Sequence, residues 1–338
     1  MEHIAIDLGG KKSQICVRDA QGKIVEELRC ETDWLDEYLK TKKPGRVILE
    51  TCTEAFLVAN QAKSAGHEVR VVPGMLVRTL GVGARKTKTD RRDAQALSEV
   101  STRIDLPSVH IPSQRARELR AMCGARDRLL SAQTQLINFV RAWLRGEGLR
   151  IRSGATETYA KRVRELGKLP SYIERELNVL DTLKEQIAAA DKELKEISEK
   201  DPVCKRLMTV PGVGPLTSVR FFSTVDKIDR FGTAHKLESY LGLAPGENSS
   251  SERQRKTSIT KAGPSAMRWV LVQAAWVART KCNYPEALPL KCWAEEIKKR
   301  RGSCIATVAM ARKLAGILFA IWRDGTVYQP KLAAKIRD

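Results

Sequence analysis

Four carboxylates in this sequence have the residue types and spacing to hold a divalent metal ion. Asp7 and Glu50 each follow a short apolar run typical of a buried strand. Asp90 and Asp93 lie three residues apart at the start of a helical pattern, which places them on one face of that helix. The chain carries 60 Lys and Arg against 40 Asp and Glu, a formal net charge of +20, and therefore attracts polyanions. Because clustered carboxylates repel a polyanion unless metal lies between them, the pattern predicts metal-dependent phosphodiester chemistry on nucleic acid.

Basic side chains accompany the two helical carboxylates. We expect them to contact the phosphates that flank the metal site, and the alternative is a solvated loop that balances the carboxylates. These residues are Arg85, Lys86, Lys88, Arg91 and Arg92. Positive charge is also concentrated at the end of the chain, where residues 251–338 hold eighteen Lys and Arg against six Asp and Glu. Such a local excess is more typical of a nucleic-acid surface than of a solvated face.

The composition argues against a membrane protein and against a zinc protein. Hydrophobic residues make up 42% of the chain, no apolar stretch is expected to span a membrane, and the sequence begins without a signal peptide. Eight scattered cysteines without a Cys-x-x-Cys pair, together with four histidines, do not predict a zinc site. They predict reduced thiols in a cytosolic protein.

Strands and helices must position the four carboxylates. Apolar runs and alternation predict strands, Gly and Pro mark turns, and helical spacing predicts the helices between them. The predicted strands cover residues 3–19, 24–30, 47–51 and 67–72, and the predicted helices cover 33–39 and 55–65. Strands followed by alternating helices and strands predict an α/β domain with a mixed sheet over residues 1–112.

From residue 113 onward the pattern is mainly helical. Leucine and isoleucine recur three and four residues apart over 180–197, a short heptad seam. This seam predicts an intramolecular helical hairpin or a dimerisation arm, and the sequence does not choose between them. Asp201-Pro202 ends the helix, and the remaining residues predict a mostly helical region with a polar loop at 246–251 and an apolar helix at 305–322.

A glycine-rich turn lies near the start of that last region. Residues 209–217 read Thr-Val-Pro-Gly-Val-Gly-Pro-Leu-Thr, with glycines at Gly212 and Gly214. This pattern predicts a helix-hairpin-helix turn, in which backbone N–H groups approach a phosphate without reading base sequence. The alternative is an ordinary turn between two helices.

Three serines, Ser249, Ser250 and Ser251, follow in a polar loop. By composition alone this loop is a flexible linker, since a serine hydroxyl is a poor nucleophile unless it or its target is activated. A metal ion that polarises the phosphate could supply the activation. Nearby cations would then stabilise the developing charge, and the candidates are Arg253, Arg255 and Lys261.

The order of the carboxylates resembles that of known nucleases. An Asp after one strand, a Glu after a later strand and a helical Asp-x-x-Asp is the pattern of ribonuclease-H-like nucleases, including RuvC-type resolvases. A competing resemblance comes from residues 4–10, Ile-Ala-Ile-Asp-Leu-Gly-Gly, which are similar to the first phosphate loop of actin-like ATPases. Those proteins have a second Asp-x-Gly loop, whereas here the later Asp-Gly pair is Asp324-Gly325, near the end of the chain. The ATPase resemblance is therefore weak.

The ordered set of motifs resembles the DEDD-type transposases of the insertion sequence 110 family. This family is related to Piv-type DNA invertases and includes bridge-RNA-guided recombinases. The matching motifs are Ala-Ile-Asp-Leu at 5–8, Leu-Glu-Thr at 49–51, Lys-Thr-Asp-Arg-Arg-Asp-Ala at 88–94, Val-Pro-Gly-Val-Gly at 210–214, Gly-Leu-Ala-Pro at 242–245 and Ile-Thr-Lys-Ala-Gly at 259–263. The resemblance implies a RuvC-like catalytic domain at 1–112, a helical coiled-coil arm at 113–201 and a transposase domain at 202–338.

The resemblance also implies a mechanism and partners. The four carboxylates would bind Mg²⁺, with Mn²⁺ as a substitute, and Ser250 would become linked to DNA as a phosphoserine. Ser251 stands where the family has glycine, so the assignment among Ser249, Ser250 and Ser251 stays open. The implied partners are double-stranded target and donor DNA, a structured guide RNA and further copies of the chain in a tetrameric dimer of dimers, without a membrane.

Two other functions remain as alternatives to this recombinase. The first is a RuvC-like junction-resolving endonuclease that uses metal-activated water and forms no covalent adduct. The second is a nucleic-acid-binding protein without catalytic activity.

Overall fold

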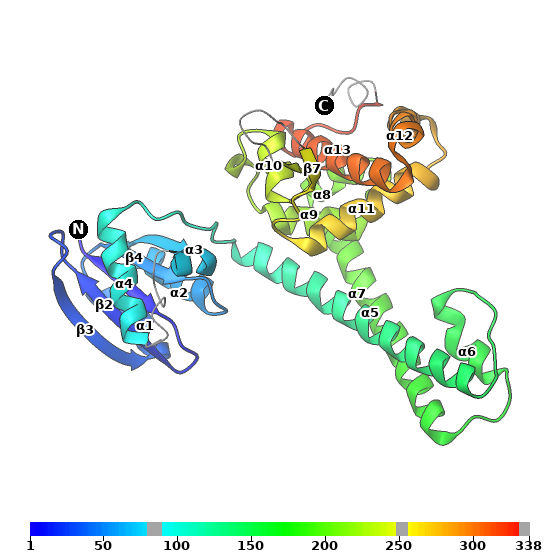
Figure 1. Cartoon of the computed structure of the whole chain (residues 1–338), viewed down its shortest axis with the longest axis horizontal. Coiled ribbons are helices and arrows are strands. Elements are labelled where there is room, and N and C mark those ends of the chain that lie inside the picture. The colour runs from blue at the N-terminus through cyan, green and yellow to red at the C-terminus, as the bar shows by residue number, and fades with distance from the viewer. Residues whose placement is uncertain (80–89, 248–255, 331–338) are drawn as a thin grey trace. The chain divides into compact units, whose positions relative to one another are not determined.

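The computed structural model describes residues 1–79, 90–247 and 256–330 of the 338-residue chain. The chain divides into two compact units, Met1–Pro112 and Ser113–Asp338, which are described separately (Figure 1). The first unit is built around a sheet, and the second is mainly helical.

A mixed five-stranded sheet forms the centre of the first unit, as the sequence predicts. Its order is β3-β2-β1-β4-β5, with β1 antiparallel to β2 and parallel to β4. The neighbouring pairs are β2–β3, which is antiparallel, and β4–β5, which is parallel. The strands are β1 (His3–Asp7), β2 (Lys12–Arg18), β3 (Ile24–Glu31), β4 (Arg46–Glu50) and β5 (Glu68–Val72).

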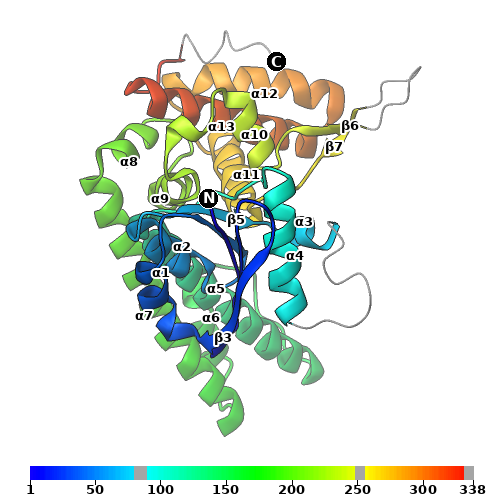
Figure 2. The ribbon, with the colours of Figure 1, turned by 90° about the vertical axis from the view of Figure 1, so that its left-hand side faces the viewer.

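Helices cover both faces of this sheet, on opposite sides in Figure 2. Ile4 and Ile6 of β1 pack against α1 (Leu35–Thr41) and α2 (Ala55–Ser64). Ala5, which points to the other face because side chains alternate along a strand, packs beside residues of α3 (Gly74–Thr79) and α4 (Asp90–Arg103). The sheet therefore has two buried faces, which explains the nearly continuous apolar runs in β1 and β4.

The predicted single strand over residues 3–19 is wrong. The structure divides it into the antiparallel strands β1 and β2, which reverse direction between Asp7 and Lys12. At this reversal a Cβ atom on Gly9 would lie 2.3 Å from the Lys12 carbonyl oxygen, so the turn needs a residue without a side chain. The polar segment Gly9-Gly10-Lys11-Lys12 is of the kind that marks a turn, so the sequence contained a signal for this reversal that the strand prediction passed over.

Two long helices form an intramolecular hairpin at the start of the second unit. They are α5 (Gln114–Gly146) and α7 (Ser171–Lys200), which lie side by side in Figure 1. Trp143 meets Tyr172 near one end, and Arg126 bonds Asp191 farther along, so the helices are antiparallel. The short helix α6 (Tyr159–Arg164) packs against α7. Of the two predicted arrangements for the heptad seam, the structure contains the helical hairpin.

The rest of the second unit is a helical core with one small two-stranded sheet. Its helices are α8 (Pro202–Leu207), α9 (Pro215–Val225), α10 (Ala234–Tyr240), α11 (Ser265–Thr280), α12 (Leu288–Arg301) and α13 (Ser303–Asp324). The strands β6 (Pro245–Glu247) and β7 (Lys256–Ile259) pair antiparallel where the sequence predicts only a polar loop. Short 3-10 helices cover Thr32–Trp34, Thr156–Thr158, Ile228–Arg230 and Pro285–Ala287.

Helix α13 corrects the expectation that no apolar segment has membrane-spanning length. By length and composition this helix could cross a membrane. However, 61% of its most apolar window is buried, and its side chains pack among α8, α10, α11 and α12. Its apolar character is therefore explained by a central position in the helical core.

Candidate active site and its scaffold

Asp7 and Glu50 end two neighbouring parallel strands. The last residue pair between the parallel strands β1 and β4 is Ile6 with Leu49, so Asp7 and Glu50 are the next residues on adjacent strands. Adjacent strands are about 4.8 Å apart. Ala5 and Ile48 pack on the face that carries α4, and the two-residue period places Asp7 and Glu50 on that same face. Both carboxylates therefore lie at one edge of the sheet.

Helix α4 brings Asp93 toward that edge. The Ser101 hydroxyl lies 2.8 Å from His3 Nδ1 at the start of β1, and Leu97 packs in the same cluster as Ala5. The helix thus runs opposite to β1. The length of β1 from His3 to Asp7 is about 13 Å. The length of α4 from Ser101 back to Asp93 is nearly the same, about 12 Å. Asp93, which is 7% exposed, is therefore placed level with Asp7.

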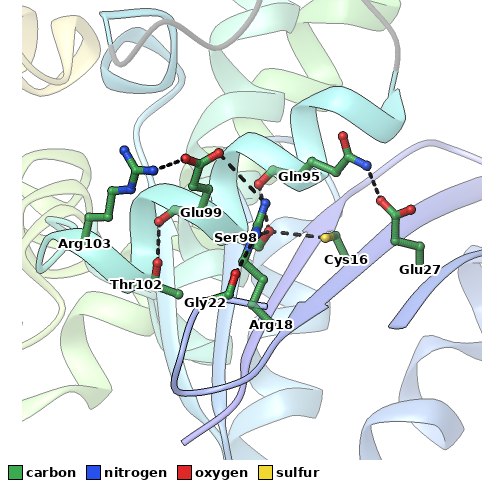
Figure 3. Close-up of polar contacts among 9 residues, drawn as sticks. All are labelled: Cys16, Arg18, Gly22, Glu27, Gln95, Ser98, Glu99, Thr102 and Arg103. Carbon is green, nitrogen blue, oxygen red and sulfur yellow. Dashed lines mark hydrogen bonds and ion pairs between the residues drawn. The ribbon is translucent and has the colours of Figure 1, made fainter. Parts of the chain in front are cut away.

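Polar contacts fix α4 on the sheet, as Figure 3 shows. The buried Ser98 hydroxyl accepts a hydrogen bond from Arg18 Nε at 3.0 Å and lies 3.3 Å from Cys16 Sγ. Glu27 of β3 accepts hydrogen bonds from Gln95 and Arg91. The bond from Arg91, followed by that from Gln95, lowers the pKa of Glu27. These contacts determine where the N-terminal end of α4 lies.

Glu50 fits against a glycine at the start of α3. A Cβ atom on Gly74 would lie 2.6 Å from Glu50 Oε1, so the carboxylate occupies the space that a side chain would fill. The Gly74 N–H donates to Thr51 Oγ1 at 3.2 Å, which ties the start of α3 to the residue after Glu50. Gly74 therefore helps to determine the position of the Glu50 carboxylate, a role that the sequence pattern did not suggest.

The structure places the predicted site residues of the first unit to different extents. Asp90 is the first residue of α4, and its side chain lies outside the described part. Arg91 and Arg92 are exposed, and Arg91 forms an ion pair with Glu27 that it would have to leave to contact a phosphate. Among the described side chains, no group of three or more His, Cys, Asp or Glu is close enough to hold a metal ion. Arg85, Lys86 and Lys88 lie outside the described residues.

All four predicted ligands are carboxylates, which is the donor chemistry that Mg²⁺ prefers. The three with described backbone and side chain, Asp7, Glu50 and Asp93, approach one edge of the sheet from three different elements. Convergence of hard oxygen donors from separate elements suits a divalent ion that binds phosphate. The donor chemistry of these residues therefore fits such an ion, with Glu50 supported by Gly74, while the described side chains alone do not form a complete metal site.

In the second unit, the two motifs that flank the serines in the sequence interlock. Gly242 (φ +68°) is so close to Ala262 that a Cβ would lie 1.9 Å from its carbonyl oxygen, and a Cβ on Gly263 (φ +80°) would lie 2.1 Å from that of Tyr240. Arg268 Nη1 donates to the carbonyls of Leu241, Ala262 and Gly263 at 3.2, 2.8 and 3.0 Å. These contacts close the base of the β6–β7 hairpin. The sequence motifs include both glycines, but no sequence pattern predicted the role of Arg268.

The serines belong to the connection between β6 and β7. Lys261, at the base, is exposed, has a left-handed φ of +57°, and its N–H donates to the Gly242 carbonyl at 3.1 Å. The hairpin therefore places this cation next to the interlocked glycines. Ser249, Ser250, Ser251, Arg253 and Arg255 lie outside the described residues.

The two glycines of the predicted helix-hairpin-helix turn differ in their surroundings. Gly212 (φ +82°) is packed against α11, where a Cβ would lie 2.3 Å from the Ala274 carbonyl oxygen. Gly214 caps the start of α9, and a Cβ there would meet nothing within 4 Å. Gly212 is thus required by internal packing, while Gly214 leaves open space at a helix N-terminus.

The chain is similar to transposases along most of its length. A family model described as "Transposase" (DEDD_Tnp_IS110) matches residues 4–147, and one described as "Transposase IS116/IS110/IS902 family" matches residues 204–290. The "Transposase for insertion sequence element IS1111A" of Coxiella burnetii is 28% identical over 96% of this chain and 91% of its own length. The "Probable family 20 transposase" of Pseudomonas aeruginosa is 27% identical, over 98% and 99%. The "Transposase for insertion sequence element IS1328" of Yersinia enterocolitica is 28% identical, over 96% and 98%.

Proposed function

Because the chain belongs to the IS116/IS110/IS902 family of transposases, which cleave and join DNA, we propose that it mobilises an insertion sequence with a metal-binding site in its first unit and a nucleophilic serine in its second. Asp7, Glu50, Asp90 and Asp93 form the metal-binding part, and one serine of the β6–β7 connection forms the nucleophilic part. The observation that carries this proposal is the convergence of Asp7, Glu50 and Asp93 on one edge of the sheet.

The four carboxylates would hold a divalent ion beside the reacting phosphate. A bound Mg²⁺, or Mn²⁺ in its place, supplies charge that polarises the phosphodiester. The chain's own part is to fix three of the ligands on rigid elements. Glu50 is held against Gly74, and Asp93 is fixed by the contacts that seat α4. Arg92, which is exposed, would contact a phosphate that flanks the bound ion.

Ser250 is the proposed nucleophile, with Ser249 and Ser251 as alternatives. Its hydroxyl oxygen forms a bond to phosphorus, and the bond from phosphorus to the leaving DNA oxygen breaks. The serine proton is lost and the leaving strand end gains one, which produces a free DNA hydroxyl. A hydroxyl of the partner strand then attacks the phosphoserine, releases the serine and restores a phosphodiester. Lys261, Arg253 and Arg255 stabilise the negative charge that develops on the phosphate.

The proposed partners follow from the same arrangement. Target and donor DNA would contact the basic C-terminal region and the open N-terminus of α9 at Gly214. A structured guide RNA would select the sites, since phosphate contacts of this kind carry no base specificity. Two DNA duplexes require several active sites, so the working form would be a dimer of dimers.

The test measures strand cleavage and covalent adducts on the element's own DNA, with and without RNA transcribed from the DNA that flanks the gene. We expect Asp93→Asn to abolish cleavage, whereas Asp33→Asn, an exposed control in the same unit, retains it. We expect Ser250→Ala to abolish the adduct, with Ser258→Ala of β7 as its control.

Three outcomes would contradict parts of this proposal. Full cleavage by Asp93→Asn removes the metal-binding assignment. A normal adduct in Ser250→Ala transfers the nucleophile to Ser249 or Ser251, each of which is tested as a single alanine variant. Cleaved ends without any adduct in the unaltered protein identify a nuclease that uses water instead of serine.

A further inference from the structure

A cavity of about 810 Å³ lies at the tip of the α5–α7 hairpin. The end of α5, residues 148–154 and the start of α6 surround it. Five arginines line it: Arg141, Arg145, Arg150, Arg152 and Arg162. In the described part of the chain, no carboxylate forms an ion pair with any of these five, whereas nearby Arg164 is paired with Glu174 and Asp181. Uncompensated positive charge around a cavity indicates an anionic ligand.

The sequence builds this cavity by ending α5 sharply. The Gly148 N–H donates to the Arg145 carbonyl at 3.1 Å, and the Leu149 N–H donates to the Leu144 carbonyl at 2.8 Å. Gly148 has a φ of +73°. This is a Schellman cap, which turns the chain back across the end of the helix. The turn brings Arg150 and Arg152 to the same cavity as Arg141 and Arg145.

Arg162 has a scaffolding role that separates it from the other four arginines. Its guanidinium donates to the carbonyls of Arg152 and Ala155. A Cβ on Gly154 would lie 2.9 Å from its Cζ, so the loop closes tightly over this group. On its other side the guanidinium lies 5.9 Å from the centre of the Tyr159 ring. Arg162 thus fixes the loop, and the other four arginines are exposed.

Apolar side chains form part of the cavity wall behind these cations. They are Ile137, Leu144, Leu149 and Ile151. Planar guanidinium groups bind phosphate oxygens in pairs and also stack on bases, while an apolar surface accommodates the base itself. A cavity of this volume is in the range for small ligands, and a paired duplex cannot enter it.

We propose that this cavity binds one or a few unpaired nucleotides of a nucleic acid, with Arg150 and Arg152 contacting the phosphates. This inference rests on the proposed function in one respect, which is that the partner of the protein is a nucleic acid. The arginines belong to the second unit and the carboxylates to the first, so the two can be altered separately. An RNA loop and a single DNA strand present the same chemistry, and the experiment distinguishes them.

The test compares the full chain carrying Arg150→Gln and Arg152→Gln with a control carrying Arg128→Gln and Arg175→Gln. The control removes two exposed arginines from α5 and α7 outside the cavity. Three labelled probes are used in a buffer that contains a metal chelator, which prevents cleavage. They are an RNA hairpin with an unpaired loop, a single-stranded DNA of about 20 nucleotides and the corresponding DNA duplex. Fluorescence anisotropy gives Kd at several salt concentrations.

We expect the cavity variant to bind an unpaired probe at least about tenfold more weakly than the control. The slope of log K against log salt should fall by about 1.4, since each phosphate contact to a single strand contributes about 0.7. Duplex affinity should match that of the control. If the cavity variant loses affinity for the RNA hairpin alone, the ligand is RNA. If it loses affinity for the single-stranded DNA alone, the ligand is DNA.

Equal affinity of the two variants for both unpaired probes would refute the cavity assignment. So would an equal loss for the duplex, because that result describes a general basic surface. Asp93→Asn serves to separate the two proposals. It should bind all three probes as the unaltered protein does, and its cleavage activity tests the proposed function independently.

Discussion

Gly242 and Ala262 are in such close contact that a single methyl group on Gly242 would lie 1.9 Å from the Ala262 carbonyl oxygen. A reciprocal contact joins Gly263 to Tyr240 at 2.1 Å. The two motifs that contain these glycines are separated by the serine loop, and the contacts hold their ends together. The Gly-Leu-Ala-Pro and Ile-Thr-Lys-Ala-Gly motifs therefore act as one structural piece.

Gly242→Ala should strongly destabilise the second unit. Left-handed φ alone costs an alanine about 1 kcal/mol, and the overlap with backbone atoms adds about 1–3 kcal/mol or more. Gly325→Ala is the matched control, since Gly325 has a φ of +66° against +68° for Gly242 but no atom within 4 Å of its Cβ position. Thermal unfolding should show a clearly lower midpoint for Gly242→Ala. Equal midpoints would mean that the two motifs do not interlock in solution.

Gly74→Ala should weaken metal-dependent activity without altering a carboxylate. The new methyl group would lie 2.6 Å from Glu50 Oε1, and the carboxylate would have to move. Because that oxygen is at the end of a flexible side chain, the thermal midpoint should hardly change. The Mg²⁺ concentration for half-maximal cleavage should rise about tenfold, as is usual when the support of a metal ligand is lost. Gly10→Ala, where a Cβ meets nothing within 4 Å, should behave as the unaltered protein.

Ser98→Ala should loosen α4 from the sheet. The hydroxyl accepts the Arg18 Nε hydrogen bond, and its loss leaves a partly buried donor without that partner at a cost of about 1–3 kcal/mol. Thr102→Ala removes a hydroxyl from the same helix that donates only to the Glu99 carbonyl one turn earlier. Urea unfolding should therefore show a larger loss for Ser98→Ala. Similar losses in the two variants would argue that the Arg18 contact does not hold the helix.

Two ion pairs that join α5 to other helices should differ in how much they stabilise the fold. Asp127 accepts two hydrogen bonds from Arg220, at 2.7 and 2.8 Å, and Arg220 is 5% exposed. Asp127→Ala leaves that guanidinium buried without its counterion and should cost about 3 kcal/mol. Asp191, which pairs with Arg126, is the more exposed of the two aspartates. Asp191→Ala should therefore lower the free energy of unfolding by less than about 1 kcal/mol. Urea midpoints of the two variants provide the comparison, and a reversed order would contradict it.

Cysteine labelling should separate buried from exposed thiols. Burial, assisted by the neighbouring Asp201 carboxylate, raises the pKa of Cys204 to about 12. Since the thiolate is the reactive form, a raised pKa means slower alkylation at pH 8. Iodoacetamide followed by peptide mass spectrometry should modify the exposed Cys292 and Cys304 rapidly, and Cys204 only after unfolding. Rapid labelling of Cys204 in the folded protein would contradict its buried position.

The sequence predicted the elements that carry the carboxylates because apolar runs report burial. Asp7 and Glu50 end strands as expected, and the helix after Asp201 begins where its side chain accepts from the Val203 and Cys204 N–H groups. The mixed sheet and the mainly helical second unit are confirmed by the structure.

Other features depend on contacts between distant residues, which a linear pattern does not contain. The roles of Gly74 and Arg268 arise only when α3 meets Glu50 and when α11 meets the hairpin base. The arginines at the arm tip are dispersed over residues 141–162 and gather only when α5 ends and the chain turns back. The division of residues 3–18 into two strands is different, because the polar Gly9-Gly10-Lys11-Lys12 segment is itself a turn signal and the strand prediction did not use it.

The closed base of the β6–β7 hairpin has a consequence for how this protein can evolve. Gly242 and Gly263 pack against backbone atoms of Ala262 and Tyr240, and Arg268 donates hydrogen bonds to three backbone carbonyls. Together these contacts hold both ends of the hairpin against the helical core. These contacts all come from residues outside positions 248–255. The sequence between those positions can therefore change during evolution while the glycines and Arg268 keep the base of the hairpin closed.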